Sequence, residues 1–173
     1  MAVSPLVKKL VQTPICRGLK ESEAGEIFEI AEESTAKKGT ILFHEGDAGD
    51  SLYIVLEGYI DVTKKGPHGA AQLLAKIGDG SVIGEMSLIG GGAARSATAE
   101  ASSDVKLLQI PTTAFSKLLR AENVAALKVV HNLAQVMSRR LLLMDEKLVD
   151  ILDKGKKKEE LADFQRILNN WSF

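Results

Sequence analysis

The spacing of apolar residues along the chain changes period twice, which divides the sequence into helices, then strands, then helices. Near the amino terminus, the segments "LVKKLVQ" (residues 6–12) and "ESEAGEIFEIAEE" (residues 21–33) carry apolar residues at helical spacing. Glu21 and Ser22, at the start of the second segment, favour a helix N-terminus. The pattern therefore predicts two short packing helices.

Between about Thr40 and Ile110, runs rich in Val, Ile, Leu and Tyr alternate with turn clusters. The runs are "TILFH", "LYIVL", "YIDVT", "QLLAKI", "SATAEA" and "VKLLQI", and the clusters include "EGDAGD", "KKGPHG" and "GDGS". The connections are too short and too rich in glycine to contain crossover helices, which argues against a parallel doubly wound sheet. We predict a mainly β fold, an antiparallel jelly-roll-like β-roll with flanking helices.

Helical spacing returns after the strands. The segment "PTTAFSKLL" begins with a proline and two threonines that favour a short helix, and a second helical pattern runs from about Asn123 to Leu152. At about 1.5 Å per residue, this second helix is on the order of 45 Å long. The predicted organisation is a β-roll with N-terminal helices (residues 1–120), a long C-terminal helix (residues 121–152) and an amphipathic tail (residues 153–173).

The long predicted helix carries an apolar stripe with the spacing of a coiled coil. Its members recur at intervals of four and three residues: Met137, Leu141, Met144, Leu148 and Ile151. Such a stripe more often faces the protein's own core, so packing on the β-roll is one interpretation. The other is a homodimer formed through the C-terminal helix. We favour the dimer, because a helix of about 30 residues is longer than a small barrel can cover.

After the long helix, the segment "DKGKKKEE" interrupts the apolar pattern. Apolar residues then resume in a different phase, at Leu161, Phe164, Leu168 and Trp171. We interpret this tail as a separate amphipathic helix or as a segment that binds a protein partner through residues 161–173. Its lysine run is typical of a solvated face rather than of a nucleic-acid site.

Charge and composition argue against several classes of function. The 22 Lys and Arg residues nearly balance 23 Asp and Glu, so no overall basic field attracts nucleic acid or an anionic membrane surface. The single cysteine, Cys16, has no partner for an internal disulfide, and the amino terminus lacks the apolar stretch of a secretory signal. No apolar run approaches the roughly 20 residues of a membrane span. We expect a cytoplasmic protein that binds neither nucleic acid nor membrane.

The candidate chemistry lies in the stretch "IGEMSLIGGGAARSATAEA". We expect its start to open a single helical turn after a strand, where free backbone N–H groups favour an anion. Gly84 permits close approach of a ligand, and Glu85 offers an acceptor suited to a hydroxyl group. Arg95 can fork onto two phosphate oxygens, Ser96 adds a hydroxyl donor and Ala97 keeps the wall open. These residues favour a ligand with one negative charge and a neighbouring hydroxyl.

Two motifs occur in order along the chain. The first consists of Gly84, Glu85, Met86, Ser87 and Leu88, a six-residue loop, and then Arg95, Ser96 and Ala97. The second, a turn that runs into an apolar strand closed by glycine, consists of Gly46, Asp47, Gly49, "LYIV" and Gly58. Together they resemble the cyclic-nucleotide-binding domain of catabolite activator proteins and of the regulatory subunits of cyclic-AMP-dependent protein kinase. The first motif resembles that family's phosphate-binding cassette, and the resemblance covers about residues 25–152.

The resemblance implies how a cyclic nucleotide would be held. Arg95, Ser96 and the backbone N–H groups of the cassette would bind the cyclic phosphate, and Glu85 would bind the ribose 2′-hydroxyl. The apolar side of the ligand would be lined by Val62, Leu74 and Ile83.

The same resemblance leaves the base less well defined. The activators contact the adenine with a Thr-Ser pair on the long helix, and the corresponding positions here are Met144 and Asp145, a departure from the family. Asp145 could accept from the adenine amino group or from guanine N1 and N2. Ser96 favours cyclic AMP, with cyclic GMP as the alternative, because threonine there is associated with cyclic GMP in related domains.

An alternative is that Arg95 and Glu85 form an ion pair inside an empty β-roll, so that the protein is an interaction scaffold acting through its tail. An ion pair alone explains neither the three glycines nor Ser96. The stretch "GDGSVIG" superficially resembles a dinucleotide fingerprint, but its last spacing is wrong and no long helix follows. The three histidines lie far apart without metal-ligand spacing. We therefore expect no catalytic group, metal or cofactor.

The short segment after the long helix holds at most one helix, whereas a helix-turn-helix domain needs several. We therefore expect a stand-alone sensor of cyclic nucleotides that is not an enzyme. In this hypothesis, ligand binding repositions the long helix and the tail and so changes a dimer or partner surface.

Overall fold

The computed structural model of the chain describes residues 5–66 and 69–155, with side chains described as far as residue 150. The described residues form two compact units that divide after Leu133. The predicted partner-binding tail, residues 161–173, lies outside the described residues.

The amino-terminal region is helical, as predicted. It contains α1 (Pro5–Val11), a short 3-10 turn η1 (Pro14–Cys16) and α2 (Glu21–Glu29). The N-cap of α2 is Lys20, whose backbone N–H donates to Glu23 at 2.7 Å. The helix also ends earlier than its apolar spacing suggested, because the chain enters a strand at Glu32 that pairs with a distant segment.

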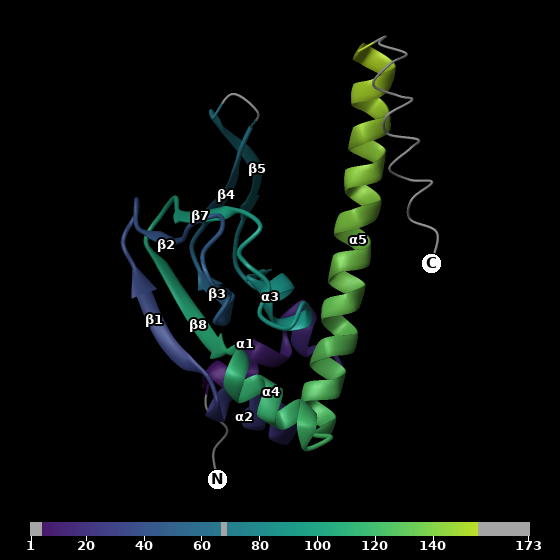
Figure 1. Cartoon of the computed structure of the whole chain (residues 1–173). Helices are drawn as coiled ribbons and strands as arrows, with labels where there is room; N and C mark the ends of the chain where they lie inside the picture. Colours follow the sequence, from purple (N-terminus) through teal and green to yellow (C-terminus); the bar gives the residue numbers. More distant parts are fainter. Residues whose placement is uncertain (1–4, 67–68, 156–173) are drawn as a thin grey trace. The chain divides into compact units, whose positions relative to one another are not determined.

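The strands form two four-stranded sheets in the described part of the chain (Figure 1). Their bounds are β1 (Glu32–Ala36), β2 (Ile41–Phe43), β3 (Ser51–Glu57), β4 (Ile60–Lys65), β5 (Ala71–Ile77), β6 (Val82–Ile83), β7 (Thr98–Ala101) and β8 (Val105–Pro111). The strand orders are β1-β8-β3-β6 and β2-β7-β4-β5, and the paired strands run antiparallel. The predicted antiparallel β-roll is confirmed, whereas β1 and β6 were not predicted.

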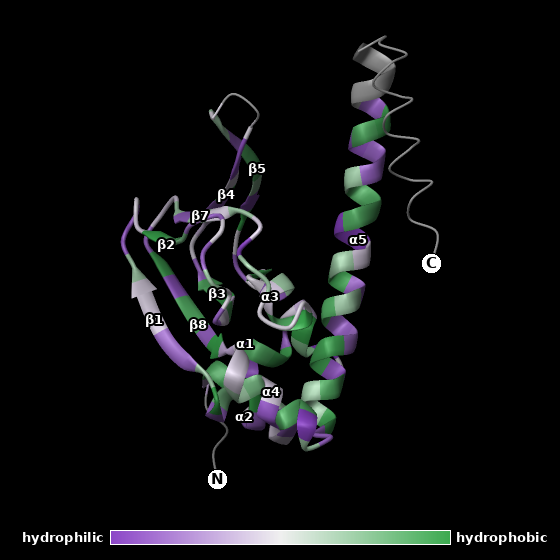
Figure 2. Ribbon diagram, viewed as in Figure 1, coloured by the Kyte–Doolittle hydropathy of each residue, from purple (hydrophilic) through white to green (hydrophobic). Residues whose placement is uncertain are grey.

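One cluster of the core is formed by residues of both sheets. Val55 from β3, Ile60 from β4, Ala99 from β7 and Leu107 from β8 form a buried cluster. Along β8 the buried apolar residues are interrupted by the more exposed Lys106 and Gln109, and Figure 2 shows both green and purple segments on this strand. The central strands β3 and β8 bury residues of both faces, since Ile54 and Leu108 are as buried as their neighbours Val55 and Leu107.

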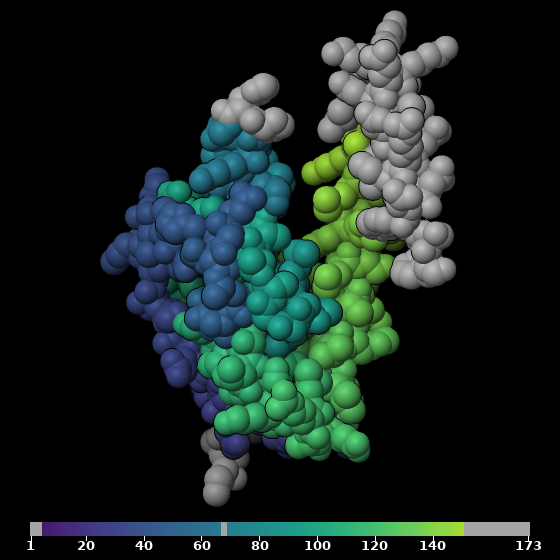
Figure 3. Space-filling view, viewed as in Figure 1, coloured from purple at the N-terminus to yellow at the C-terminus, as the bar shows by residue number. Residues whose placement is uncertain are grey.

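Three helices follow or interrupt the strands: α3 (Glu85–Ile89), α4 (Thr112–Arg120) and α5 (Val124–Gly155). The short and the long C-terminal helices are thus where the apolar spacing predicted them. In Figure 3 the teal atoms of the loop after α3 lie beside the green atoms of α4, in agreement with the contact between α3 and α4. Among the described residues, no helix combines the length and hydropathy of a membrane span.

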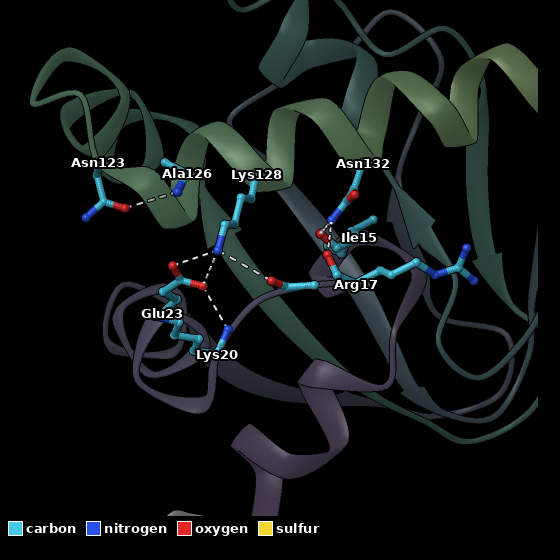
Figure 4. A network of polar contacts seen from close by, with 9 residues as sticks. Ile15, Arg17, Lys20, Glu23, Asn123, Ala126, Lys128 and Asn132 are labelled. Carbon is cyan, nitrogen blue, oxygen red and sulfur yellow. Dashed lines mark hydrogen bonds and ion pairs between the residues drawn. The ribbon is translucent and has the colours of Figure 1, made fainter.

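The first turns of α5 are held on the amino-terminal segment by polar contacts (Figure 4). The buried amide of Asn132 donates to the carbonyl oxygens of Ile15 at 2.9 Å and Arg17 at 2.8 Å. Lys128 donates to the carboxylate of Glu23 at 2.7 Å, and this contact lowers the pKa of Glu23. The start of α5 and the segment around η1 therefore form one packed body.

Replacing Asn132 with Ala should lower the free energy of unfolding by about 1–3 kcal/mol, because two carbonyl oxygens lose their donor in a buried place. Urea denaturation measures the change. Lys128→Gln is the matched control, since its ion pair is partly exposed and should contribute no more than about 1 kcal/mol. A smaller loss in the Asn132 variant than in the control would show that the buried amide does not hold α5.

Candidate functional site

The cassette begins where β6 passes into α3. Gly84 caps α3 in the left-handed conformation, with a φ of 75°, and the single short helix predicted from the sequence follows. Glu85 and Ser87 are buried, whereas Met86 is exposed. The left-handed turn requires glycine, because other residues adopt that conformation only at an energetic cost.

Arg95 is the most unusual residue of the site, because only 4% of its surface is exposed although it carries a charge. Its Nη1 donates to the carbonyl oxygen of Ser51 at 2.7 Å and, more weakly, to that of Gly84 at 3.5 Å. Its Nη2 lies 3.2 Å from a carboxylate oxygen of Asp50. The guanidinium also lies 4.2 Å from the ring centre of Phe43, a cation–π contact.

These contacts leave the Arg95 guanidinium incompletely satisfied. Its Nε is buried and has no hydrogen-bond partner among the described residues. Its acidic partner, Asp50, is 77% exposed, so this ion pair is solvated on one side. An unpaired buried donor is costly, and most such groups in native proteins find an acceptor. Nε and Nη2 are the kind of paired donors that fork onto two oxygens of a phosphate.

Ser96 and Ala97 follow Arg95 with different exposures. The hydroxyl of Ser96 is exposed and lies 3.4 Å from the sulfur of Met86, and the carbonyl oxygen of Ser96 accepts from Lys64 at 2.7 Å. Ala97 is buried. The structure therefore brings Gly84 close to Arg95 and Met86 close to Ser96, and their contacts with a ligand stay a prediction.

Two glycines allow the backbone around the cassette to pack this closely. A Cβ atom at Gly84 would overlap Nη1 of Arg95, and one at Gly49 would overlap the hydroxyl of Ser87 and approach the carbonyl oxygen of Ala93. The turn that holds Gly49 is therefore packed directly against the cassette. This contact gives a physical reason for the second motif that the sequence contains.

The three residues predicted to line the apolar side of the ligand, Val62, Leu74 and Ile83, differ in how deeply they are buried. Ile83 is buried in the core cluster, and Val62 packs against that cluster while partly exposed. Leu74 is 53% exposed and lies at a β-bulge, because the register between β4 and β5 shifts from Val62 opposite Ala75 to Thr63 opposite Leu73. Bulges often redirect a side chain beside a binding site.

Met144 and Asp145, the predicted base contacts, lie on α5 in the second compact unit. Both side chains are exposed. Their contact with a base therefore stays a prediction.

Sequence reasoning missed three residues around Arg95. Phe43 and Tyr53 stack with ring centres 6.1 Å apart, and Arg95 lies near both rings. Burial raises the pKa of Tyr53, and the charge of Asp50 acts in the same direction. The sequence alternative paired Arg95 with Glu85, whereas the ion pair described above is with Asp50. The available signal was the position of Asp50, directly after Gly49 in the second motif.

Comparison with known proteins agrees with this arrangement. The family model described as "Cyclic nucleotide-binding domain" matches residues 33–122, which is more than half of the chain. The chain belongs to the cyclic nucleotide-binding domain family. The matched residues contain β2 to β8, α3 and α4, and so include the whole cassette.

Three known proteins illustrate what this chain is similar to. It is 31% identical over 150 residues to the cyclic AMP receptor protein of Thermus thermophilus, covering 87% of this chain and 67% of that protein. It is 31% identical to a cAMP-dependent protein kinase regulatory subunit of Yarrowia lipolytica, covering 64% of this chain but 28% of the subunit. A crystal structure of a cyclic nucleotide-binding domain from Methylobacillus flagellatus superposes with a TM-score of 0.77 at 27% identity, covering 84% of this chain and 83% of that one.

Replacing Gly49 with Ala should destabilise the domain by about 1–3 kcal/mol, because the added methyl group has no space beside Ser87. Urea denaturation measures the loss, and amide spectra should show the cassette displaced. Gly25→Ala is the control: Gly25 lies in α2 with open space around it, so Ala should stabilise the domain by up to about 1 kcal/mol. Equal stability of the two variants would contradict the packing argument.

Proposed function

We propose that the protein binds a cyclic nucleotide, cyclic AMP first and cyclic GMP second, and relays binding to the C-terminal helix. The observation that carries this proposal is the buried Nε of Arg95, beside the αL turn of Gly84, for which the described residues provide no acceptor. A phosphate is the acceptor that a forked guanidinium binds best. Family membership supports the same ligand class.

The proposed contacts follow the predicted residues. Arg95, Ser96 and cassette backbone N–H groups bind the cyclic phosphate, and Glu85 accepts from the ribose 2′-hydroxyl. The exposed apolar surface of Leu74, with Val62 and Ile83 behind it, takes the apolar side of the ligand. On α5, Met144 packs on the base, and Asp145 accepts from its exocyclic amino group.

Binding in this proposal replaces one partner of Arg95 by another. The carboxylate of Asp50 contacts Nη2 of Arg95 in this structure. Because this carboxylate is largely exposed to water, it can move away from Arg95 without a desolvation cost. In this proposal the ligand contacts the cassette and α5 at the same time in only one of two conformations of the protein. The ligand therefore binds that conformation more tightly and increases its population. That the chain acts as a stand-alone cytoplasmic sensor, and that it is not an enzyme, stay predictions.

Arg95→Ala should weaken cyclic AMP binding at least about 100-fold, because two or more charge-assisted hydrogen bonds are lost at about 1.5–3 kcal/mol each. Isothermal titration calorimetry of nucleotide-free protein with cyclic AMP and cyclic GMP measures the change. Arg17→Ala is the matched control, since its guanidinium has no ion pair among the described residues and lies outside the cassette. Asp145→Ala should alter the ranking of the two nucleotides while retaining binding.

The titration also has a clear negative result. Unchanged affinity in the Arg95 variant would place the ligand elsewhere. If folded, empty wild-type protein binds neither nucleotide, the scaffold alternative gains weight and the search moves to residues 161–173.

We also propose that the protein forms a homodimer through the distal half of α5. Within the second unit, Leu141 and Met144 of the coiled-coil stripe are exposed although apolar. Exposed apolar residues at a and d spacing are the usual seam of a two-stranded coiled coil.

Leu141→Glu should convert the dimer into a monomer. The glutamate would be buried at the seam of the coiled coil without a positively charged partner, which disfavours association. Sedimentation equilibrium at micromolar concentration measures the mass, which should fall from twice the chain mass of 18.6 kDa to that mass. Leu143→Glu is the control, because Leu143 is at least as exposed but lies off the stripe. A monomeric wild type, or equal dissociation of both variants, would refute this interface.

A further inference from the structure

A hollow lies between part of the cassette and α4. It has a volume of about 470 Å³ and lies between the loop after α3 and the polar face of α4. Its lining residues are Ser87, Leu88, Gly91, Gly92, Thr112, Thr113, Ser116, Lys117 and Arg120. Figure 3 shows the two segments adjacent on one face of the molecule. A hollow of this volume is in the range of sites for small ligands.

The charge of this hollow is uniformly positive. Lys117 and Arg120 line it, and no carboxylate does. Elsewhere in the described chain, lysines such as Lys37, Lys64 and Lys106 each pair with a carboxylate within 3.2 Å. Lys117 and Arg120 make no ion pair with any described residue. Two adjacent cations without a counter-charge attract an anion, and the concave wall strengthens this attraction.

The remaining polar groups of the hollow are hydroxyls, which can donate to an anion. Thr113 and Ser116 lie one turn apart on the same helix as the two cations. Neither hydroxyl is engaged with another described residue, whereas that of Thr112 donates to the carbonyl oxygen of Asp50 at 2.9 Å. Hydroxyl donors combined with Lys and Arg are the groups that recognise phosphate oxygens.

We propose that this hollow is a second anion site, which binds the phosphate group of a small molecule. Lys117 and Arg120 supply the charge, and Thr113 and Ser116 supply neutral donors. The hollow shares Ser87, Leu88, Gly91 and Gly92 with the cassette, but its charged groups come from α4, and neither Glu85 nor Arg95 lines it. A small ligand fits better than a nucleic acid, since the basic area is a single hollow on a chain of net charge −1. The proposal is independent of whether the cassette binds a cyclic nucleotide.

Titration of the full chain with inorganic phosphate, followed by ¹⁵N amide spectra, tests the site. The amide resonances of Gly91, Thr113 and Ser116 should show the largest chemical-shift changes, and these changes should saturate as phosphate is added. The double variant K117Q/R120Q should weaken binding about tenfold or more, because both charged donors are lost. The matched control is K8Q/K38Q, which changes the net charge equally at exposed lysines without ion pairs in the described chain. Phosphate-induced shifts at Gly91, Thr113 and Ser116 that are lost in K117Q/R120Q report the hollow, whereas shifts at Ser96 that persist in that variant report the cassette.

Two further arms distinguish the source of the phosphate and exclude a general salt effect. Glycerol 3-phosphate should bind more tightly than inorganic phosphate if the natural ligand is a phosphate ester, and no more tightly if it is the free ion. Sodium chloride at equal ionic strength should produce no saturable shift. Shifts that do not saturate, that chloride reproduces, or that persist in K117Q/R120Q as in K8Q/K38Q would overturn the proposal.

Discussion

The burial of Arg95 is the constraint on which the rest of the cassette depends. A guanidinium withdrawn from water must find acceptors, and the chain supplies the carbonyl oxygen of Ser51, the ring face of Phe43 and one carboxylate oxygen of Asp50. This set satisfies both terminal nitrogens but not Nε. Among the described residues, one buried donor of this site is left without an acceptor, and buried donors in native proteins usually have one.

Close packing around that arginine explains why glycine occurs where it does. The backbone at Gly84 approaches Nη1 so closely that no side chain fits, and the turn at Gly49 approaches the cassette in the same way. The two motifs lie far apart in the sequence but form the two sides of one contact. The roll brings them together because β3, which follows the first turn, pairs with β6, which leads into the cassette.

The sequence predicted most of the fold because its strands are short, apolar and bounded by glycine-rich turns. It did not predict β1, whose residues "EESTA" are mostly polar and whose strand is fixed by pairing with β8. It also did not predict the role of Asp50, which lies 45 residues from Arg95 in the chain and reaches it only through the fold. The cassette residues were identified because their order is local, whereas Arg95 also contacts Phe43 of β2, Ser51 of β3 and Asp50 just before β3.

Asp50 also connects the cassette to the helices that follow. Its carbonyl oxygen accepts from the backbone N–H of Thr112 at 2.8 Å and from the hydroxyl of Thr112 at 2.9 Å, so the start of α4 is fixed to the residue that pairs with Arg95. From α4 the chain enters α5 through Glu122, which has a φ of 54°, and Asn123, which caps the first turn. Such a left-handed conformation is uncommon for a residue other than glycine. A change at Asp50 therefore acts on a rigid, hydrogen-bonded connection to α4, and α4 is joined to α5 by a turn of defined geometry. This connection offers the proposed relay a route from the cassette to the start of α5, in addition to the proposed contacts of Met144 and Asp145 with the base.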